Sequence, residues 1–373
     1  MCGGRLDSGE VRQQTLADSV DGNEGKMATS PVKGAAGASL SPSEQIMQLS
    51  TAYMAPACLY IAAKLRIADQ LANGPKPVAQ MADGARGIHE NSLYRVLRAL
   101  ASVGVFSETA PRVFANTPAS ETLREGAPGS MRDEVMWMTS PTHFRVFAEL
   151  RHAVETGETG MRKMTGLDPF EFLKQHPAED QEFNAAMSAL TSQFAPAVLE
   201  AYDFGDLGTI ADIGGGHGTL LCAILKKHYG LRGIVFDAPH VTARAMPCIA
   251  SAGLSERCKA VSGSFFESVP AADSYILKSV IHDWDDGRAI AVLTKCAGSM
   301  RAGKGKLILL EMVVRPGNDP DLSKWVDLEM LMMAGGRERT EAEFSDLLAK
   351  AGLRLTRVIP TKSPVCVIEA VKV

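Results

Sequence analysis

Apolar residues recur with helical spacing through residues 41–204, and the pattern is interrupted mainly by Gly and Pro. In the segment 91–104, Leu93, Leu97 and Leu100 fall on one face, with Val96 and Val103 beside them, and Gly104 is a typical C-terminal stop. The segment 46–65 is apolar on most faces and contains Pro56, which should kink or divide it. These patterns predict buried helices, either within one domain or between subunits.

A short hairpin is predicted directly after Gly104, from the apolar pairs at 105–106 and 113–114. A helix, a glycine and a hairpin in succession form a winged-helix arrangement. A DNA reader would need several exposed basic residues on its recognition helix, but this helix offers only Arg95 and Arg98. We therefore favour an interaction domain over a DNA-binding domain.

Strands and helices alternate after Phe204. We expect strands at 209–213, 233–236, 259–261, 274–281 and 306–312, with helices at 218–229, 241–252 and 287–300 between them. This alternation is typical of a parallel sheet covered by helices on both faces, an α/β fold. Residues 353–359 and 366–371 are expected to form an edge hairpin.

Composition and charge exclude several classes of protein. The chain has 373 residues, a net charge of −4 and seven scattered cysteines, with no CxxC pair or zinc-ligand spacing. No bound metal is therefore expected, and the slightly acidic charge favours no nucleic-acid partner. No membrane partner is expected either, because no apolar run reaches the roughly 18 residues of a membrane span. Residues 1–40 are rich in small and polar residues and are predicted to be disordered. We expect a cytoplasmic protein with domains at 41–204 and 205–373.

A glycine-rich turn carries the strongest local signal for a ligand. The sequence Ala-Asp-Ile-Gly-Gly-Gly-His-Gly-Thr at 211–219 lies between a predicted strand and helix. Gly214 and Gly216 would allow a ligand to approach the backbone closely. Asp237 follows at the end of the second strand, where an acidic side chain can accept hydrogen bonds from ribose hydroxyls. The spacing does not match a dehydrogenase fingerprint, and the motif of a phosphate-binding loop is absent.

A candidate base lies further along the chain. Strand alternation would place Lys278, Val280 and His282 on one face, with His282 at the carboxyl end of its strand. Glu311 ends the next strand, and the loop 335–340 supplies Glu338. Carboxylates beside an imidazole fix its tautomer and stabilise its cation, which suits a general base.

These motifs together resemble a known enzyme family. DIGGGHGT, FDAPHV, LKSVIHDWDD, LLEM and GGRERTEAEF, in this order, resemble the S-adenosylmethionine-dependent O-methyltransferases of the plant caffeate and isoflavone type. Their bacterial small-molecule relatives and acetylserotonin methyltransferase are similar as well. The resemblance implies a helical winged-helix dimerisation domain and a Rossmann-like domain with seven strands, the last antiparallel. It also implies a homodimer that binds S-adenosyl-L-methionine.

The resemblance assigns roles to individual residues. His282 matches the general base, and Glu311 and Glu338 match the acids that orient it. Gly214, Gly216, Asp237, Lys278 and Met187 match positions that contact the cofactor, and Phe183 and Asp283 are expected to border the substrate. The chain departs from the plant pattern where Asp and Met usually contact adenine, because it has Ser264 and Phe265 there. Ser264 can still accept a hydrogen bond, and Phe265 can still stack.

The resemblance implies O-methylation of a phenolic or other aromatic hydroxyl in a small molecule. N-methylation or a non-methylating reaction on the same fold is the alternative, and a winged-helix regulator is a more distant one. Eight Met, Trp and Phe residues suggest an apolar pocket that could pack around flat rings, although they could equally form ordinary core: Met136, Trp137, Met138, Phe144, Phe147, Met330, Met332 and Met333.

Overall fold

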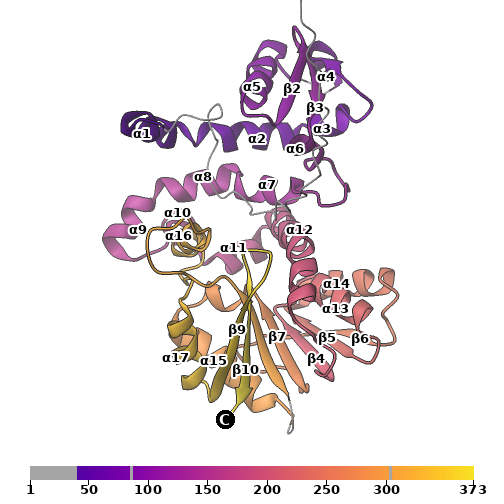
Figure 1. The fold of residues 1–373 in the computed structure, drawn as a ribbon, viewed down its shortest axis with the longest axis vertical. Helices are drawn as coiled ribbons and strands as arrows, with labels where there is room; N and C mark the ends of the chain where they lie inside the picture. Colours follow the sequence, from indigo (N-terminus) through magenta and orange to yellow (C-terminus); the bar gives the residue numbers. More distant parts are fainter. Residues whose placement is uncertain (1–39, 85–86, 302–304) are drawn as a thin grey trace, which may run out of the picture.

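The computed structural model describes residues 40–84, 87–301 and 305–373. The prediction that residues 1–40 are disordered falls almost entirely outside these ranges. Figure 1 shows a helical upper part placed over a lower part built around a large sheet. A mixed α/β fold with a helical N-terminal part is therefore confirmed.

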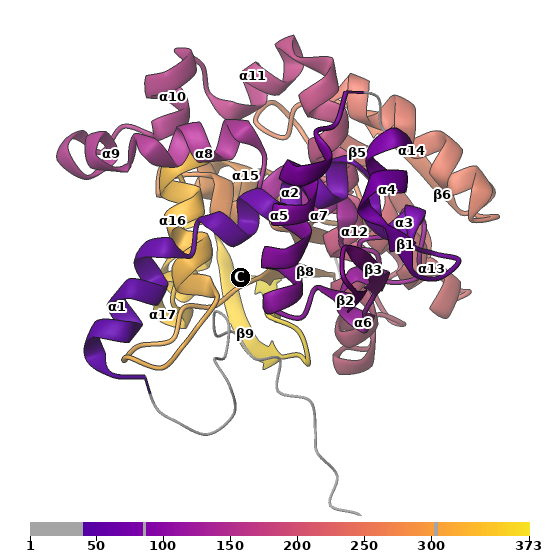
Figure 2. The ribbon, with the colours of Figure 1, turned by 90° about the horizontal axis from the view of Figure 1, so that it is seen from above.

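The apolar N-terminal segment forms two consecutive helices, α1 (Pro42–Thr51) and α2 (Met54–Lys64). The break between them precedes Pro56, which lies in the first turn of α2, where its missing N–H breaks no helical hydrogen bond. Several apolar side chains here are exposed, among them Ile46 at 66% and Met47 at 68%. Figure 2 shows α1 reaching away from the rest of the N-terminal part.

The expectation that no apolar run could span a bilayer was wrong by length and composition alone. Residues Pro42–Lys64 together make a helical stretch of 23 residues, and its most apolar window of 18 residues has a mean hydropathy of 1.3, which is enough to cross a membrane by these two measures. Only 11% of that window is buried inside this one chain, so the burial expected for the apolar segment 46–65 is not provided by the chain itself.

The predicted helix and hairpin are present. Helix α5 (Glu90–Ser102) buries Leu93, Leu97 and Leu100, whereas Val103 lies beyond the helix end and is 39% exposed. The hairpin consists of β2 (Phe106–Ala110) and β3 (Val113–Asn116), and β1 (Lys76–Pro77) pairs with β3 to make a three-stranded sheet. The short helices α3 (Ile67–Gln70) and α4 (Val78–Gly84) complete this small unit.

A second group of helices connects this unit to the large sheet. It comprises α6 (Pro118–Glu121), α7 (Arg132–Met138), α8 (Pro141–Ala148), α9 (Leu150–Thr156), α10 (Gly160–Thr165), α11 (Pro169–Gln175) and α12 (Pro177–Ala201). The long helix α12 packs against α7 at one end and against α13 (Thr219–Lys227) and the sheet at the other. It therefore joins the two parts of the molecule (Figure 1).

The large sheet has seven strands in the order β6-β5-β4-β7-β8-β10-β9. Their bounds are β4 (Thr209–Ile213), β5 (Arg232–Asp237), β6 (Cys258–Ser262), β7 (Ser274–Lys278), β8 (Lys306–Glu311), β9 (Leu353–Pro360) and β10 (Cys366–Lys372). The last strand, β10, runs in the opposite direction to the other six strands. The C-terminal hairpin is confirmed, but β10 pairs with both β8 and β9, so it is interior and only β9 lies at the edge.

Helices cover both faces of this sheet. One face packs against α15 (Asp286–Ser299) and α17 (Glu341–Lys350), and the other against α12, α13 and α14 (Pro239–Ser251). Alternate strand residues point to opposite faces, so Leu277 joins the first core and Ile276 joins the second. The remaining helix, α16 (Ser323–Met333), packs among the upper helices α8, α9 and α10.

A buried carboxylate on β10 ties several elements together. Glu369 is 5% exposed and accepts hydrogen bonds from Tyr202 at the end of α12, from Lys306 on β8, and from Arg357 and Thr356 on β9. Burial alone would raise the pKa of Glu369, but the bonds from Arg357, Lys306 and Tyr202 hold it well below its usual range. The ionised carboxylate therefore stabilises the junction of α12 with the sheet.

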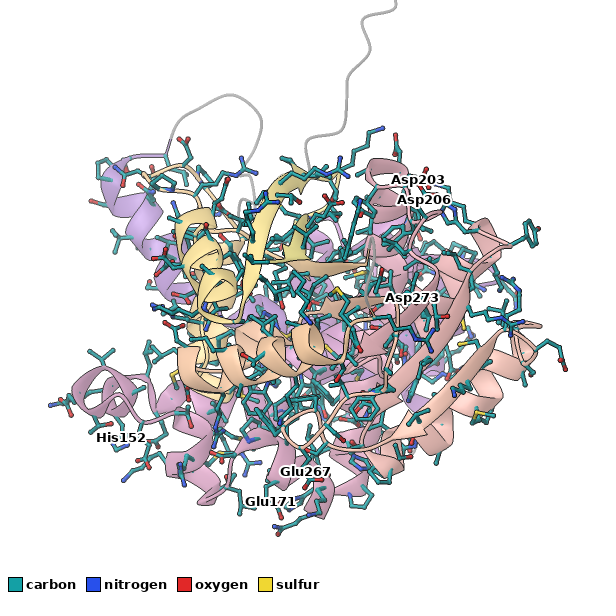
Figure 3. The ribbon with its side chains drawn as sticks, turned by 90° about the horizontal axis from the view of Figure 1, so that it is seen from below. His152, Glu171, Asp203, Asp206, Glu267 and Asp273 are labelled. Carbon is teal, nitrogen blue, oxygen red and sulfur yellow. The ribbon has the colours of Figure 1, made fainter. Side chains whose placement is uncertain are left out.

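We predict that Glu369→Gln lowers the free energy of unfolding by about 2–3 kcal/mol at pH 7, because Lys306 and Arg357 lose their counter-charge. A depressed carboxyl pKa stabilises the fold above the unfolded pKa of about 4.3, and this contribution is lost as the pH falls below it. The difference between parent and variant should therefore shrink in acid. Urea unfolding at several pH values measures it, with Glu267→Gln, an exposed position labelled in Figure 3, as the control. Equal stability of parent and Glu369→Gln at pH 7 would contradict this interpretation.

Candidate functional site

The glycine-rich turn follows β4 at the carboxyl edge of the sheet. Gly214 and Gly216 have φ angles of 69° and 56°, in the left-handed region that favours glycine. A Cβ atom on Gly214 would lie 2.7 Å from Cγ2 of Val280, so the turn after β4 packs directly against the turn after β7. Glycine at 214 therefore leaves room for the Val280 side chain, and the expected approach of a ligand to Gly214 and Gly216 stays a prediction.

Asp237, the last residue of β5, closes this turn. Its two carboxylate oxygens accept hydrogen bonds from the backbone amides of Gly216 at 2.9 Å and Ala238 at 2.7 Å. Burial raises the pKa of Asp237, although these two amide bonds oppose the shift. Each oxygen keeps a second lone pair that can accept a hydrogen bond from a ligand.

A cleft of about 330 Å³ lies beside the turn. All seven predicted cofactor-binding residues line it: Gly214, Gly216, Asp237, Ser264, Phe265, Lys278 and Met187. The hydroxyl oxygen of Ser264 accepts a bond from the amide of Phe266 at 3.3 Å, and the Phe265 ring packs against Phe266. The cleft thus brings the predicted cofactor residues together, and their contact with a cofactor stays a prediction.

Two unpaired polar atoms in the cleft indicate a polar ligand. Oδ1 of Asp212 and Nε2 of His217 are buried and have no hydrogen-bond partner among the described residues. Burial raises the pKa of Asp212 to about 7. Neither residue was predicted as a site residue, although both belong to the glycine-rich motif. The position of Asp212 near the end of β4 is the signal that could have identified it, whereas a loop histidine has no specific signature of its own.

The predicted strand 274–281 is shorter than expected, and this changes how His282 is placed. Strand β7 ends at Lys278, Ser279 takes a φ of 52°, and residues Ile281–Asp283 form a 3₁₀ turn. The alternation of Lys278, Val280 and His282 along one strand face was therefore wrong. The chain turns here because Oε1 of Glu311 accepts the amides of Val280 at 3.1 Å and Ile281 at 2.9 Å, replacing strand pairing.

His282 lies between two buried carboxylates, as predicted. Its Nδ1 is 2.7 Å from Oε1 of Glu338, a hydrogen bond, and 3.7 Å from Oε2 of Glu311. Asp283 is close to the other ring nitrogen, with Oδ1 3.7 Å from Nε2. The Glu311 side chain is fully buried and that of His282 is 13% exposed. The bond to Glu338 leaves Nε2 as the ring atom free to exchange a proton with a ligand.

The carboxylates decide the charge of the ring. Burial lowers the pKa of His282, but the opposing effect of Glu311, Glu338 and Asp283 is larger, and the pKa rises to about 10. Burial also raises the pKa of Glu311 to about 7 and that of Asp283 to about 6. Without ligands, the site therefore favours an imidazolium paired with carboxylate.

The same three residues, His282, Glu311 and Glu338, have one donor atom each within 4.8 Å of one another, a spacing that could hold a metal ion. A histidine and two carboxylates are also a donor set that divalent metals accept. However, the 2.7 Å separation of Nδ1 and Oε1 is that of a hydrogen bond with a proton between the two atoms. The expectation of a site without metal remains a prediction.

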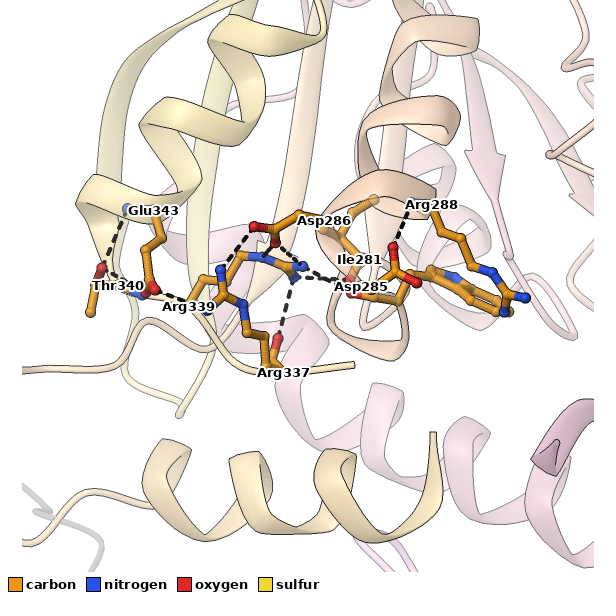
Figure 4. Close-up of polar contacts among 9 residues, drawn as sticks. Ile281, Asp285, Asp286, Arg288, Arg337, Arg339, Thr340 and Glu343 are labelled. Carbon is orange, nitrogen blue, oxygen red and sulfur yellow. Dashed lines mark hydrogen bonds and ion pairs between the residues drawn. The ribbon is translucent and has the colours of Figure 1, made fainter. Parts of the chain in front are cut away.

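Arg339 fixes the turn that carries His282, a role that no sequence pattern indicated. The side chain is fully buried and donates to the carbonyl oxygens of Ile281 at 3.1 Å and Trp284 at 2.8 Å, on either side of His282. Asp286 accepts from Nε and Nη2 of the same guanidinium (Figure 4). A buried cation is unexpected in sequence-based reasoning, because arginine is ordinarily exposed.

The loop before Arg339 is in equally close contact with this turn. A Cβ atom on Gly336 would lie 2.0 Å from the carbonyl oxygen of His282 and within 2.5 Å of two further backbone atoms of residues 283–284. Only glycine fits there without displacing the backbone. Glu338, two residues later, is thereby brought to the imidazole, and its own amide donates to Asp327 at 2.9 Å.

A second cavity of about 540 Å³ adjoins the cleft. His282 lines this cavity, and both predicted substrate residues, Phe183 and Asp283, line the cavity and the cleft together with Lys278 and Met187. Half of the predicted apolar set lines the cavity: Trp137, Met138, Met330 and Met333. The other half does not, because Met136 and Met332 are core residues while Phe144 and Phe147 are about one-third exposed.

Comparison with known proteins gives two family matches that together span most of the chain. Residues 147–354 match an O-methyltransferase domain, and residues 47–126 match an O-methyltransferase dimerisation domain. The phenazine O-methyltransferase PhzM of Lysobacter antibioticus is 45% identical over 326 residues, which are 87% of this chain and 95% of that protein.

Two solved structures are similar over nearly their whole length. The crystal structure of LaPhzM has a TM-score of 0.86 at 44% identity and covers 90% of this chain and 100% of its own. The O-methyltransferase NcsB1 from neocarzinostatin biosynthesis, in complex with S-adenosylmethionine and 2-hydroxy-5-methyl naphthoic acid, has a TM-score of 0.73 at 34% identity, covering 86% and 96%. By these matches, the chain belongs to the S-adenosylmethionine-dependent O-methyltransferase family.

Proposed function

We propose that this enzyme methylates a hydroxyl group on an aromatic small molecule and that His282 is its general base. The observation that carries the proposal is the junction of the two spaces. The nucleoside-sized cleft and the aromatic cavity share Lys278, Met187 and Asp283, and His282 opens into the cavity. A flat acceptor in the cavity would therefore meet the base beside the cofactor.

The residues around the cleft fit S-adenosylmethionine, which supplies an electrophilic methyl group when bound. Asp237 would accept hydrogen bonds from the ribose hydroxyls, and Gly214 and Gly216 leave space for a close approach of the ligand. Ser264 and Phe265 would contact the adenine, with Met187 and Lys278 beside the reacting end. The unpaired carboxylate oxygen of Asp212 suits the ammonium group of the methionine part.

The chemistry at the acceptor is a proton transfer. A phenol with a pKa near 10 is mostly protonated at neutral pH, so its oxygen becomes a good nucleophile when Nε2 of His282 takes the proton. Glu338, bonded to Nδ1, holds the ring and stabilises the imidazolium, and Glu311 adds a second negative charge. Alignment of the acceptor oxygen with the methyl group can supply a further ~7–11 kcal/mol.

The high pKa of His282 in the absence of ligands has a consequence for this role. A ring that is already protonated cannot act as a base, so the proton must leave before the reaction. The positive charge of the bound sulfonium disfavours a second cation nearby and lowers the pKa of the imidazole. Activity should therefore rise with pH until the ring in the complex is neutral.

We further propose a cytoplasmic homodimer with a role in secondary metabolism. The match to a dimerisation domain and the exposed apolar side chains of α1 and α2, such as Met47 and Met54, support the dimer. Six free cysteines in the described chain fit a reducing compartment. The phenazine and naphthoic acid in the names of the relatives support an aromatic metabolite as the acceptor.

The proposal is tested by methyl transfer from labelled S-adenosylmethionine to a panel of phenols, hydroxynaphthalenes and hydroxyphenazines, each paired with its amino analogue. Mass spectrometry of the products distinguishes O-methyl from N-methyl compounds. We expect O-methyl products. Exclusive methylation of the amino analogues would replace the proposal with N-methylation.

We predict that His282→Ala lowers kcat by about 10²–10⁴, the usual contribution of a general base. The loss should be smaller for acceptors whose phenol is already ionised at the assay pH, such as nitrophenols, because no proton then has to be removed. Single-turnover rates across a series of acceptor pKa values measure this dependence. A uniform loss across the series would mean that His282 orients the acceptor and is not the base.

We predict that Glu311→Gln moves the ascending limb of the pH profile of kcat to lower pH by about 1–3 units. Removing a negative charge makes the imidazolium less stable, so the pKa of His282 falls. Glutamine can still accept the amides of Val280 and Ile281, so the turn should persist. Glu171→Gln, an exposed position in Figure 3, controls for the change in net charge. An unchanged profile would show that Glu311 does not influence the ring.

We predict that Arg339→Lys lowers kcat at least tenfold with little change in cofactor affinity. A single ammonium cannot bond both carbonyls around His282 and Asp286 at once, so the ring loses its fixed position. Arg337→Lys, at the exposed neighbouring arginine that also pairs with Asp286, is the matched control. A rise in the Kd of S-adenosylhomocysteine without a fall in kcat would contradict a positioning role for Arg339.

A further inference from the structure

The acceptor cavity contains a polar group that the proposed proton transfer does not use. Glu329, on α16, lines the cavity with a side chain that is 12% exposed. Its Oε1 is 2.9 Å from Nε2 of His143, a residue of α8 that is 3% exposed. Nδ1 of His143 is in turn 3.1 Å from the hydroxyl oxygen of Ser140. The buried Ser140 and His143 and the partly buried Glu329 thus form a hydrogen-bonded chain that ends at the cavity.

The hydrogen bonds of this chain are all satisfied by one arrangement of protons. With its proton on Nε2, the His143 ring accepts from the Ser140 hydroxyl at Nδ1 and donates to Oε1 of Glu329. The second oxygen of Glu329 has no partner among the residues that the structure describes. Its position is fixed by the bond at the first oxygen, which leaves a preoriented acceptor facing the cavity.

A second carboxyl group, from another helix, also lines the cavity. Glu134, on α7, lines the cavity and makes no hydrogen bond or ion pair within the described chain, and burial raises its pKa. Besides His282, the lining contains two basic side chains, Lys278 and Arg145. Lys278 lies at the junction with the cleft, and Arg145 is exposed and donates to the carbonyl of Pro141.

This arrangement discriminates among aromatic acceptors by their substituents. A buried hydrogen-bond acceptor is costly when it is left unpaired, so a ligand that donates to Glu329 gains affinity over one that places a methyl group there. A carboxylate substituent would meet like charge at Glu329 and Glu134 and would be repelled. The apolar wall around Trp137 and Met333 accepts the ring itself without distinguishing its substituents.

We propose that the acceptor carries, besides the hydroxyl that is methylated, an amino or hydroxyl substituent that donates a hydrogen bond to Glu329, and that the cavity rejects acceptors with a carboxylate at that position. The proposal deepens the proposed function and rests on it for the identity of the reacting group. The structural argument concerns binding, so binding and methyl transfer are measured separately.

The test uses hydroxynaphthalenes with one further substituent, which is amino, hydroxyl, methyl or carboxylate at each of the same ring positions. Binding is measured by calorimetry on the dimeric full-length protein saturated with S-adenosylhomocysteine, and methyl transfer is measured with S-adenosylmethionine. At the best ring position, we expect the amino and hydroxyl compounds to bind at least tenfold more tightly than the methyl and carboxylate compounds. Equal or tighter binding of the carboxylates would overturn the proposal.

The variant Glu329→Gln tests whether Glu329 causes the preference for hydrogen-bond-donating substituents. Its neutral amide can donate to a carboxylate as well as accept from an amine, so the preference for amino over carboxylate compounds should fall at least tenfold. Glu155→Gln removes the same charge from an exposed position on α9 outside the cavity and should keep the parent's preference. A preference that persists in Glu329→Gln would overturn the assignment to Glu329.

The two proposals can fail independently. Selective binding of the donor compounds without methyl transfer to any of them would contradict the proposed function while supporting the cavity's preference. Methyl transfer with a preference for carboxylates would support the proposed function and contradict the cavity's preference. If Glu329→Gln does not fold, the parent's preference across the substituent series still decides whether the cavity selects hydrogen-bond donors.

Discussion

The site depends on one buried electrostatic cluster, the imidazole of His282 held between the carboxylates of Glu311 and Glu338. Two negative groups and a ring can share a buried space only when their charges and hydrogen bonds are matched. Glu311 satisfies this requirement by accepting two backbone amides, and Glu338 does so by bonding Nδ1. The cluster therefore fixes both the direction of the ring and the path of the chain after β7.

The surrounding elements hold this cluster in place through close contacts with the turn after β7. The Val280 side chain in this turn packs against Gly214, and the backbone of residues 282–284 lies against Gly336. Arg339 then bonds the carbonyls on both sides of His282 (Figure 4). Catalytic groups need to be held within a fraction of an ångström, and contacts between backbone segments are less flexible than contacts between side chains.

The cleft and the cavity next to the cluster are built from different parts of the fold. The cleft at the glycine-rich turn is formed by the carboxyl ends of neighbouring parallel strands, as is usual for nucleotide-like ligands in α/β folds. The cavity above it is formed by helices of the upper part, with α12 linking the two. Because the two spaces are built largely from different elements, substitutions in the helices can alter the cavity without altering the cleft.

The sequence by itself determined the alternating strands and helices and the glycine-rich turn with Asp237. It also indicated that His282, Glu311 and Glu338 lie together. These follow from local rules, since hydrophobic periodicity, glycine placement and acids at strand ends are visible in short windows. The length of β7, the interior position of β10 and the buried Arg339 were decided by the tertiary structure. Each depends on partners far away in the sequence, such as Glu311 for the turn at 279–281 and β8 for β10. The acceptor cavity belongs to the same class, because its wall combines residues from α7, α8, α16 and β7 that no local pattern connects.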